Sequence, residues 1–94
     1  MSMTRDRAET IALRALAFIA ADEELLPQLA GATGAALGEV KDRVQDPAFL
    51  AGILEFLCME DRWIRRFCEA EGLPFEAPLQ ALMALPGQQR DEWP

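Results

Sequence analysis

The sequence predicts an all-α fold, a compact bundle of five or six short helices. Apolar residues recur at three- and four-residue intervals along nearly the whole chain, and the alternation typical of a half-buried strand is absent. Glycines, prolines and capping carboxylates divide this pattern into short segments. The chain has 94 residues, so each half lies near the length of about 40 residues below which domains rarely fold unaided. We therefore expect one helical domain over residues 1–87, built on a single shared core.

The first helix is expected to begin near Thr4 or Asp6 and to run to about Ala21. No charged residue occurs from Ala15 to Ala21, so this end of the helix should be buried on most sides. The apolar positions of the segment are Ala8, Ile11, Ala12, Ala15, Leu16, Phe18 and Ile19.

The acidic run at residues 22–24 predicts the start of a second helix, because carboxylates cap and stabilise a helix N-terminus. Pro27 supports a break nearby, since proline costs little in a first turn but disrupts the interior of a longer helix. The stretch from Gly31 to Gly34 can end this helix with a left-handed C-cap. The apolar positions between these signals are Leu25, Leu26, Leu29 and Ala30.

A short third helix is expected over about residues 35–45, followed by a clear start signal for the fourth. Asp46 supplies a capping carboxylate, and Pro47 suits the first position of a helix. The apolar positions are Leu37, Val40 and Val44 in the third helix, and Phe49, Leu50, Ile53, Leu54 and Leu57 in the fourth.

The chain is expected to break again near Glu60 and Asp61, and a fifth helix then runs to Gly72. A sixth helix begins after Leu73-Pro74 and stops at Pro86-Gly87, and residues 88–94 form a mobile tail without periodicity. The apolar positions are Trp63, Ile64, Phe67 and Cys68 in the fifth helix, and Leu79, Leu82 and Met83 in the sixth.

Residues 18–37 and 56–75 share one pattern at an offset of 38 positions, with Phe18 aligned to Phe56 and Gly34 to Gly72. One interpretation is a duplicated helical unit, with repeats at 16–45 and 54–83 packed face to face on one core. The other is that two unrelated amphipathic helices both end at a glycine. Under duplication, residues 16–37 should overlay residues 54–75. Both glycines are expected to have positive φ.

The periodic positions also predict which side chains form the core. Full burial is expected where apolar residues follow helical spacing in segments without interrupting charge. The predicted core includes Ile11, Leu16, Phe18, Ile19, Leu29, Ile53, Leu54, Leu57, Ile64 and Phe67.

The charge balance disfavours several classes of partner. The net charge of −7 supports solubility and opposes nonspecific binding to nucleic acid or to anionic membranes. No apolar run approaches the roughly 18 residues of a membrane-spanning helix, and the N-terminal segment is a poor signal peptide. Cys58 and Cys68 would lie about 15 Å apart on one helix, beyond disulfide reach. These features predict a cytoplasmic protein with reduced thiols.

The residues needed for common catalytic chemistry are missing. The chain contains no histidine or tyrosine, and its one serine is Ser2 near the N-terminus. Cys58 and Cys68 have no histidine to activate them and are interpreted as small buried hydrophobes. The glycine-rich stretch 31–38 lacks the Gly-Lys-Ser/Thr ending of a phosphate loop, and the run 22–24 lacks the spacing of a calcium loop. We expect no catalytic residue, no bound cofactor and no metal.

One cluster is a candidate contact for a partner. Arg62, Trp63, Arg65 and Arg66 combine arginine with an aromatic residue, and both types are enriched at protein interfaces. A solvated, ion-paired helix face with Trp63 in the core is the competing interpretation. Trp93 is a second candidate anchor, without helical neighbours to bury it.

Several segments of the chain resemble a known family. They are residues 8–23, Thr33-Gly34, Asp46-Pro47-Ala48-Phe49-Leu50 and Glu71-Gly72-Leu73-Pro74. They are similar to landmarks of small alphaproteobacterial proteins classed as a domain of unknown function, and the resemblance covers about residues 8–86. It implies a compact helical fold in a bacterial cytoplasm, and it brings no catalytic residue.

Taken together, these features favour a noncatalytic adaptor or regulatory domain that binds another protein or a second copy of itself. The alternative is a carrier of a small molecule or lipid in an apolar pocket between helices. An enzyme that uses carboxylates alone is a third hypothesis. A pocket with converging polar groups would favour the carrier, whereas an exposed apolar patch would favour the protein-binding function.

Overall fold

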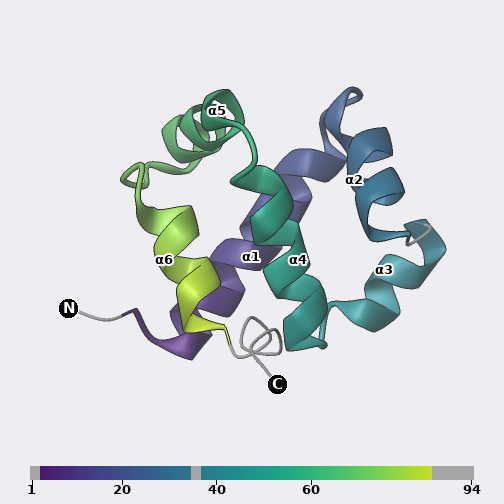
Figure 1. Ribbon diagram of the computed structural model, residues 1–94, viewed down its shortest axis with the longest axis horizontal. Helices are drawn as coiled ribbons and strands as arrows, with labels where there is room; N and C mark the ends of the chain where they lie inside the picture. Colours follow the sequence, from purple (N-terminus) through teal and green to yellow (C-terminus); the bar gives the residue numbers. More distant parts are fainter. Residues whose placement is uncertain (1–2, 35–36, 86–94) are drawn as a thin grey trace, which may run out of the picture.

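The computed structural model describes residues 3–34 and 37–85, and within these ranges it contains six α-helices and no strand. The all-α prediction is thus confirmed (Figure 1). The predicted stop at Pro86-Gly87 and the tail 88–94 lie outside the described residues. The helices are α1 (Arg5–Ala20), α2 (Leu25–Thr33), α3 (Leu37–Arg43), α4 (Pro47–Leu57), α5 (Asp61–Glu71) and α6 (Ala77–Ala84).

Helices α1, α2 and α4 start where a nearby side chain accepts hydrogen bonds from free backbone N–H groups. Thr4 accepts a hydrogen bond from the N–H of Arg7 at 3.1 Å, and Asp46 accepts one from Ala48 at 3.0 Å. Asp22 accepts hydrogen bonds at the start of α2, from the N–H of Glu24, the residue before the helix, at 2.8 Å and from that of Leu25 at 3.1 Å. The predicted starts of these three helices are therefore confirmed, and each has a local cause.

The ends of α2 and α5 are confirmed as left-handed glycine caps. Gly34 has φ of 72° and Gly72 has φ of 69°, a region that residues with a Cβ rarely adopt. The N–H of Gly34 donates to the carbonyl of Ala30, and that of Gly72 to the carbonyl of Cys68, which satisfies carbonyls left free at the helix end.

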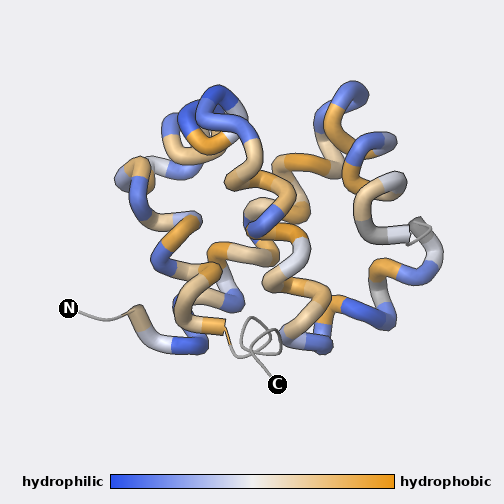
Figure 2. Tube along the Cα trace, viewed as in Figure 1, coloured by the Kyte–Doolittle hydropathy of each residue, from blue (hydrophilic) through white to orange (hydrophobic). Residues whose placement is uncertain are grey.

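The centre of the molecule is formed by α1 and α4, which pack against each other (Figure 1). Helix α6 packs on both of them, and so does α2. In Figure 1, α5 and α6 lie on one side of the central pair, and α2 and α3 lie on the other. Figure 2 shows hydrophobic positions recurring along the two central helices. The chain therefore has one shared core, to which both halves contribute.

Eight of the ten predicted core residues are buried, and the other two are corrected by the structure. Leu16 and Phe18 are only half-buried. The buried stripe of α1 follows Ala8, Ala12 and Ala15, and each helical residue turns the side chain by about 100°. Leu16 and Phe18 therefore flank that stripe on opposite sides, and Phe18 is covered only in part.

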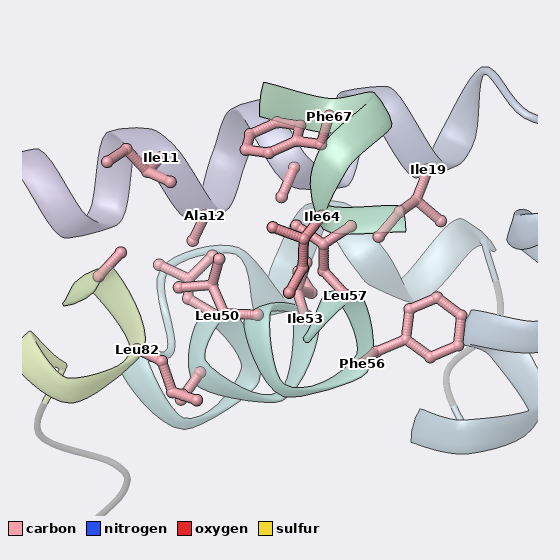
Figure 3. Close-up of a cluster of buried hydrophobic side chains, with 14 of the residues drawn as sticks. Ile11, Ala12, Ile19, Leu50, Ile53, Phe56, Leu57, Ile64, Phe67 and Leu82 are labelled. Carbon is pink, nitrogen blue, oxygen red and sulfur yellow. The ribbon is translucent and has the colours of Figure 1, made fainter. Parts of the chain in front are cut away.

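Large side chains from four helices fill the space between α1 and the other elements (Figure 3). Ala12 of α1 points toward α4, where Leu50 lies, so a small residue of one helix faces a large one of the next. The ring of Phe18 meets that of Phe67 from α5 edge-on at 5.5 Å. The core thus also fixes the position of α5.

The two proposed repeats show both shared and different features. Helices α2 and α5 each end one residue before their aligned glycine. The aligned phenylalanines differ in their surroundings, because Phe18 is half-buried against Phe67 whereas Phe56 is buried against Trp63. Helix α6 packs closely on α1, and α3 has no packing of that extent with any described helix. A true duplication stays a prediction.

Candidate interaction surface

The arginines of α5 do not form one free basic patch. The guanidinium of Arg66 lies 3.0 Å from the carboxylate of Asp22, in the turn between α1 and α2. Arg62 lies 3.8 Å from Glu60, and Arg65 is exposed. Of the three predicted basic contacts, two are therefore engaged with carboxylates of the same chain, and their role toward a partner stays a prediction.

Trp63 belongs to the core side of α5. It is 6% exposed, and its ring stacks on Phe56 of α4 with centroids 4.9 Å apart and an interplanar angle of 25°. This contact fixes α5 against α4, so the structure places Trp63 in packing and leaves the three arginines as the exposed part of the predicted contact. Trp93 lies outside the described residues.

An apolar surface runs from the turn before α6 along the outside of this helix, where Leu79 and Met83, two of the three apolar positions predicted for it, are exposed. Phe75 is 46% exposed, Leu79 51% and Met83 68%, and they recur every four residues. We call these three side chains the α6 stripe. The opposite side of α6 is buried against the core through Ala77, Pro78, Ala81 and Leu82. Helix α6 is therefore apolar on both sides, and only one of them is covered by the described residues.

The α6 stripe borders a groove of about 270 Å³ between the start of α5 and α6. Ile64 and Cys58 contribute apolar surface from the α4–α5 side, and Phe75 and Leu79 contribute it from the α6 side. Two acidic residues, Asp61 and Glu76, also border the groove. The complete lining is Cys58, Asp61, Ile64, Phe75, Glu76 and Leu79.

Neither thiol near this groove is activated as a nucleophile. Burial, with smaller effects of nearby Cys68 and Glu55, raises the pKa of the Cys58 thiol to about 11. Burial also raises the pKa of Cys68, whose sulfur donates a hydrogen bond to the carbonyl of Pro74 at 3.3 Å. Because the thiolate is the reactive form, both cysteines are protonated and unreactive near neutral pH. In the groove, Cys58 provides a soft apolar surface.

A second and larger hollow of about 470 Å³ lies between α2, α3 and α4. Arg43 and Glu55 are its charged side chains, and the guanidinium of Arg43 lies 4.8 Å from the ring centroid of Phe49. Gly52 leaves space at the surface of α4, since a Cβ added there would have no neighbour within 4 Å. The lining residues are Ala32, Arg43, Ala48, Phe49, Gly52, Glu55, Phe56 and Met59.

Among the described residues, no three or more cysteine and carboxylate side chains gather in an arrangement that could hold a metal ion. Within residues 3–34 and 37–85, every helix is too short or too polar to cross a membrane.

Comparison with known protein families gives a match for this chain. Residues 5–88 match the family described as "Protein of unknown function (DUF3572)". The comparisons with curated proteins and with solved structures found no match.

Proposed function

The chain belongs to this family of unknown function, and from that premise we propose that it is a noncatalytic domain that binds another protein. The observation that carries the proposal is the α6 stripe, three large apolar side chains in water beside an apolar groove. Clustered exposed apolar side chains are typical of interaction sites. Helix α6 packs on the core with one apolar side, so its other apolar side, exposed within the described part of the chain, can contact a partner without loss of the fold.

The absence of bond chemistry is part of the same proposal. The sequence contains no histidine, and both cysteines have thiol pKa values raised by burial. The proposed location is the cytoplasm, where free thiols such as these stay reduced. A purified, metal-free preparation that turned over a substrate would overturn the noncatalytic part of the proposal.

The test is affinity capture of the tagged chain from its own cells, comparing wild type with Leu79→Glu. Leu79 is half exposed, so the substitution should leave the fold intact while it places a charge in the groove. Gln80→Glu is the matched control, because it adds the same charge at the next, exposed position. We expect Leu79→Glu to reduce the captured partner at least tenfold and Gln80→Glu to leave it unchanged, as quantified by mass spectrometry. Equal capture by all three proteins would contradict the proposal.

The predicted contact of Arg62, Trp63, Arg65 and Arg66 is tested in the same assay. Arg65→Glu is the informative variant, because Arg66 is held by Asp22 and its loss would also disturb the fold. If the arginines of α5 contact acidic groups of the partner, Arg65→Glu should weaken capture, whereas a partner with basic residues beside α5 should be captured more strongly by this variant. Unchanged capture by this variant would restrict the interface to α6 and its groove.

A second candidate function, a carrier of a small molecule or lipid, is favoured by the hollow between α2, α3 and α4. Its volume of about 470 Å³ lies within the range of about 300–1,000 Å³ typical of ligand pockets. The test is the fluorescence of anilinonaphthalene sulfonate with wild type and with Gly52→Leu, which fills the hollow from α4. Tight binding that Gly52→Leu abolishes would favour the carrier, and equal weak binding would exclude this hollow.

A further inference from the structure

We propose that the groove between α5 and α6, with the α6 stripe, binds a short amphipathic helix of another protein whose apolar face is flanked by lysine or arginine. The inference rests on the proposed function and adds the chemistry of the partner. It follows from the spacing of the apolar side chains and from the charges around them.

The spacing of the α6 stripe indicates the shape of the partner. Leu79 and Met83 lie about one turn apart on α6, roughly 6 Å along its axis, and Phe75 extends the apolar surface into the turn before the helix. A partner helix of two to three turns presents apolar residues over the same length, at positions i, i+4 and i+7. Ile64 and Cys58 deepen one end of this surface into the groove, which can receive a single larger side chain. Met83 adapts to different neighbours, since its side chain is unbranched and flexible.

The charges around the groove indicate basic residues beside the partner's apolar face. Asp61 and Glu76 line the groove, and no basic side chain is among the described residues that line it. On the other side of α5, Arg66 is turned toward Asp22. The whole chain carries a net charge of −7, which attracts a basic segment over a longer range. Complementary charges of this kind select among partners and accelerate their association.

The same charges argue against a second copy of this chain on this surface. A two-fold symmetric dimer brings the same patch of both subunits together. Asp61 and Glu76 of one copy would then face the same two carboxylates of the other. A partner with basic residues removes this repulsion, so a different protein is the favoured occupant.

The test is a selection of random 16-residue peptides displayed on phage against the full chain, with counter-selection on Leu79→Glu. Selected peptides are expected to carry apolar residues at helical spacing and a net positive charge. Synthetic versions should bind wild type at least tenfold more tightly than Leu79→Glu in fluorescence anisotropy. Peptides that are neutral or acidic, that bind Leu79→Glu equally well, or that fail to enrich would overturn the inference.

The contribution of charge is tested with a matched pair of double variants. Asp61→Asn with Glu76→Gln removes the two groove carboxylates, and Glu23→Gln with Glu69→Gln removes two exposed carboxylates elsewhere. We expect the first pair to weaken binding of a selected basic peptide at least threefold and to flatten its salt dependence. The second pair should do neither. Equal effects of both pairs would show that only the overall charge matters and would overturn the role of the groove carboxylates.

Failure of this inference and failure of the proposed function give different results. If Leu79→Glu reduces capture from cells but the double variant Asp61→Asn with Glu76→Gln does not, the protein-binding function stands and the inference of a basic partner is wrong. If Leu79→Glu retains every captured protein, the proposed function itself fails.

Discussion

Asp22 shows how one residue connects three elements. Its carboxylate accepts hydrogen bonds from the N–H groups of Glu24 and Leu25, at the start of α2, and pairs with Arg66 of α5. The two backbone hydrogen bonds lower the pKa of this carboxyl below its ordinary value. Desolvation opposes them, and the hydrogen bond and charge of Arg66 make smaller contributions that lower the pKa further. The charged form therefore stabilises the turn after α1.

Asp22→Asn is expected to remove a stability contribution that depends on pH. A carboxyl with a lowered pKa in the folded state stabilises the fold at pH values above its unfolded pKa of about 4, and this contribution is lost as the pH falls through the folded pKa. The difference in unfolding free energy between wild type and variant should thus be largest near pH 7 and shrink below about pH 4. Urea unfolding at pH 7 and pH 3 measures it. A constant difference would show that the charge of Asp22 is irrelevant.

Gly72→Ala should destabilise the fold by about 1 kcal/mol, because Gly72 has φ of 69° and the left-handed region penalises a Cβ. An added Cβ would have no neighbour within 4 Å, so the effect comes from the backbone alone. Gly52→Ala is the control within α4, where the same change should stabilise by about 0.5–1 kcal/mol. Chemical denaturation measures both. Two changes of the same sign would contradict the explanation.

At the scale of the helix, the degree of burial decides how much each aromatic ring contributes to stability. Phe67→Ala should cost about 3–5 kcal/mol, since Phe67 is fully buried. Phe18→Ala should cost clearly less, because Phe18 flanks the stripe and is only half-buried, although the two rings touch. Comparison of the two variants by urea unfolding tests this order. An equal or larger loss of unfolding free energy for Phe18→Ala would contradict the expected effect of burial.

Helix α1 approaches α4 and α6 through small side chains. Ala8, Ala12 and Ala15 have no exposed surface, and Ala12 points toward Leu50 of α4 (Figure 3). Ala12→Leu should therefore force the helices apart and cost about 1–3 kcal/mol. Ala17→Leu, at an exposed position of the same helix, should change stability little. Thermal unfolding followed by circular dichroism measures both variants.

Helix starts and ends were predictable because their causes are local. Asp46-Pro47 and Gly72 act through hydrogen bonds and φ values within a few residues. The covered side of α6 was not predictable, because both sides are apolar and the choice depends on how α1 and α4 are placed. For the same reason the sequence pointed to the arginines of α5 and missed the groove, whose lining comes from residues 58–64 and 75–79.

At the scale of the whole molecule, the first half cannot bury its apolar stripe without the second. Helix α1 packs on α4 and α6, and both belong to the second half. A fragment of residues 1–45 is therefore expected to be largely unfolded in isolation, as measured by circular dichroism. Mixing it with a fragment of residues 46–94 should increase the helical signal beyond the sum of the two. A stable, cooperatively melting 1–45 fragment would contradict the single shared core.

The contact between α1 and α6 also has a consequence during synthesis on the ribosome. After Ala20 has been added, the ribosome must add the residues up to Ala84 before α6 is available, which takes on the order of 3–13 s at about 5–20 residues per second. During this interval α1 has no α6 to pack against, so the part of its apolar stripe that has left the ribosome lacks a partner that it later contacts. Helix α1 waits longest for its last packing partner, so it is the helix that chaperones specific for short apolar segments have the most time to bind.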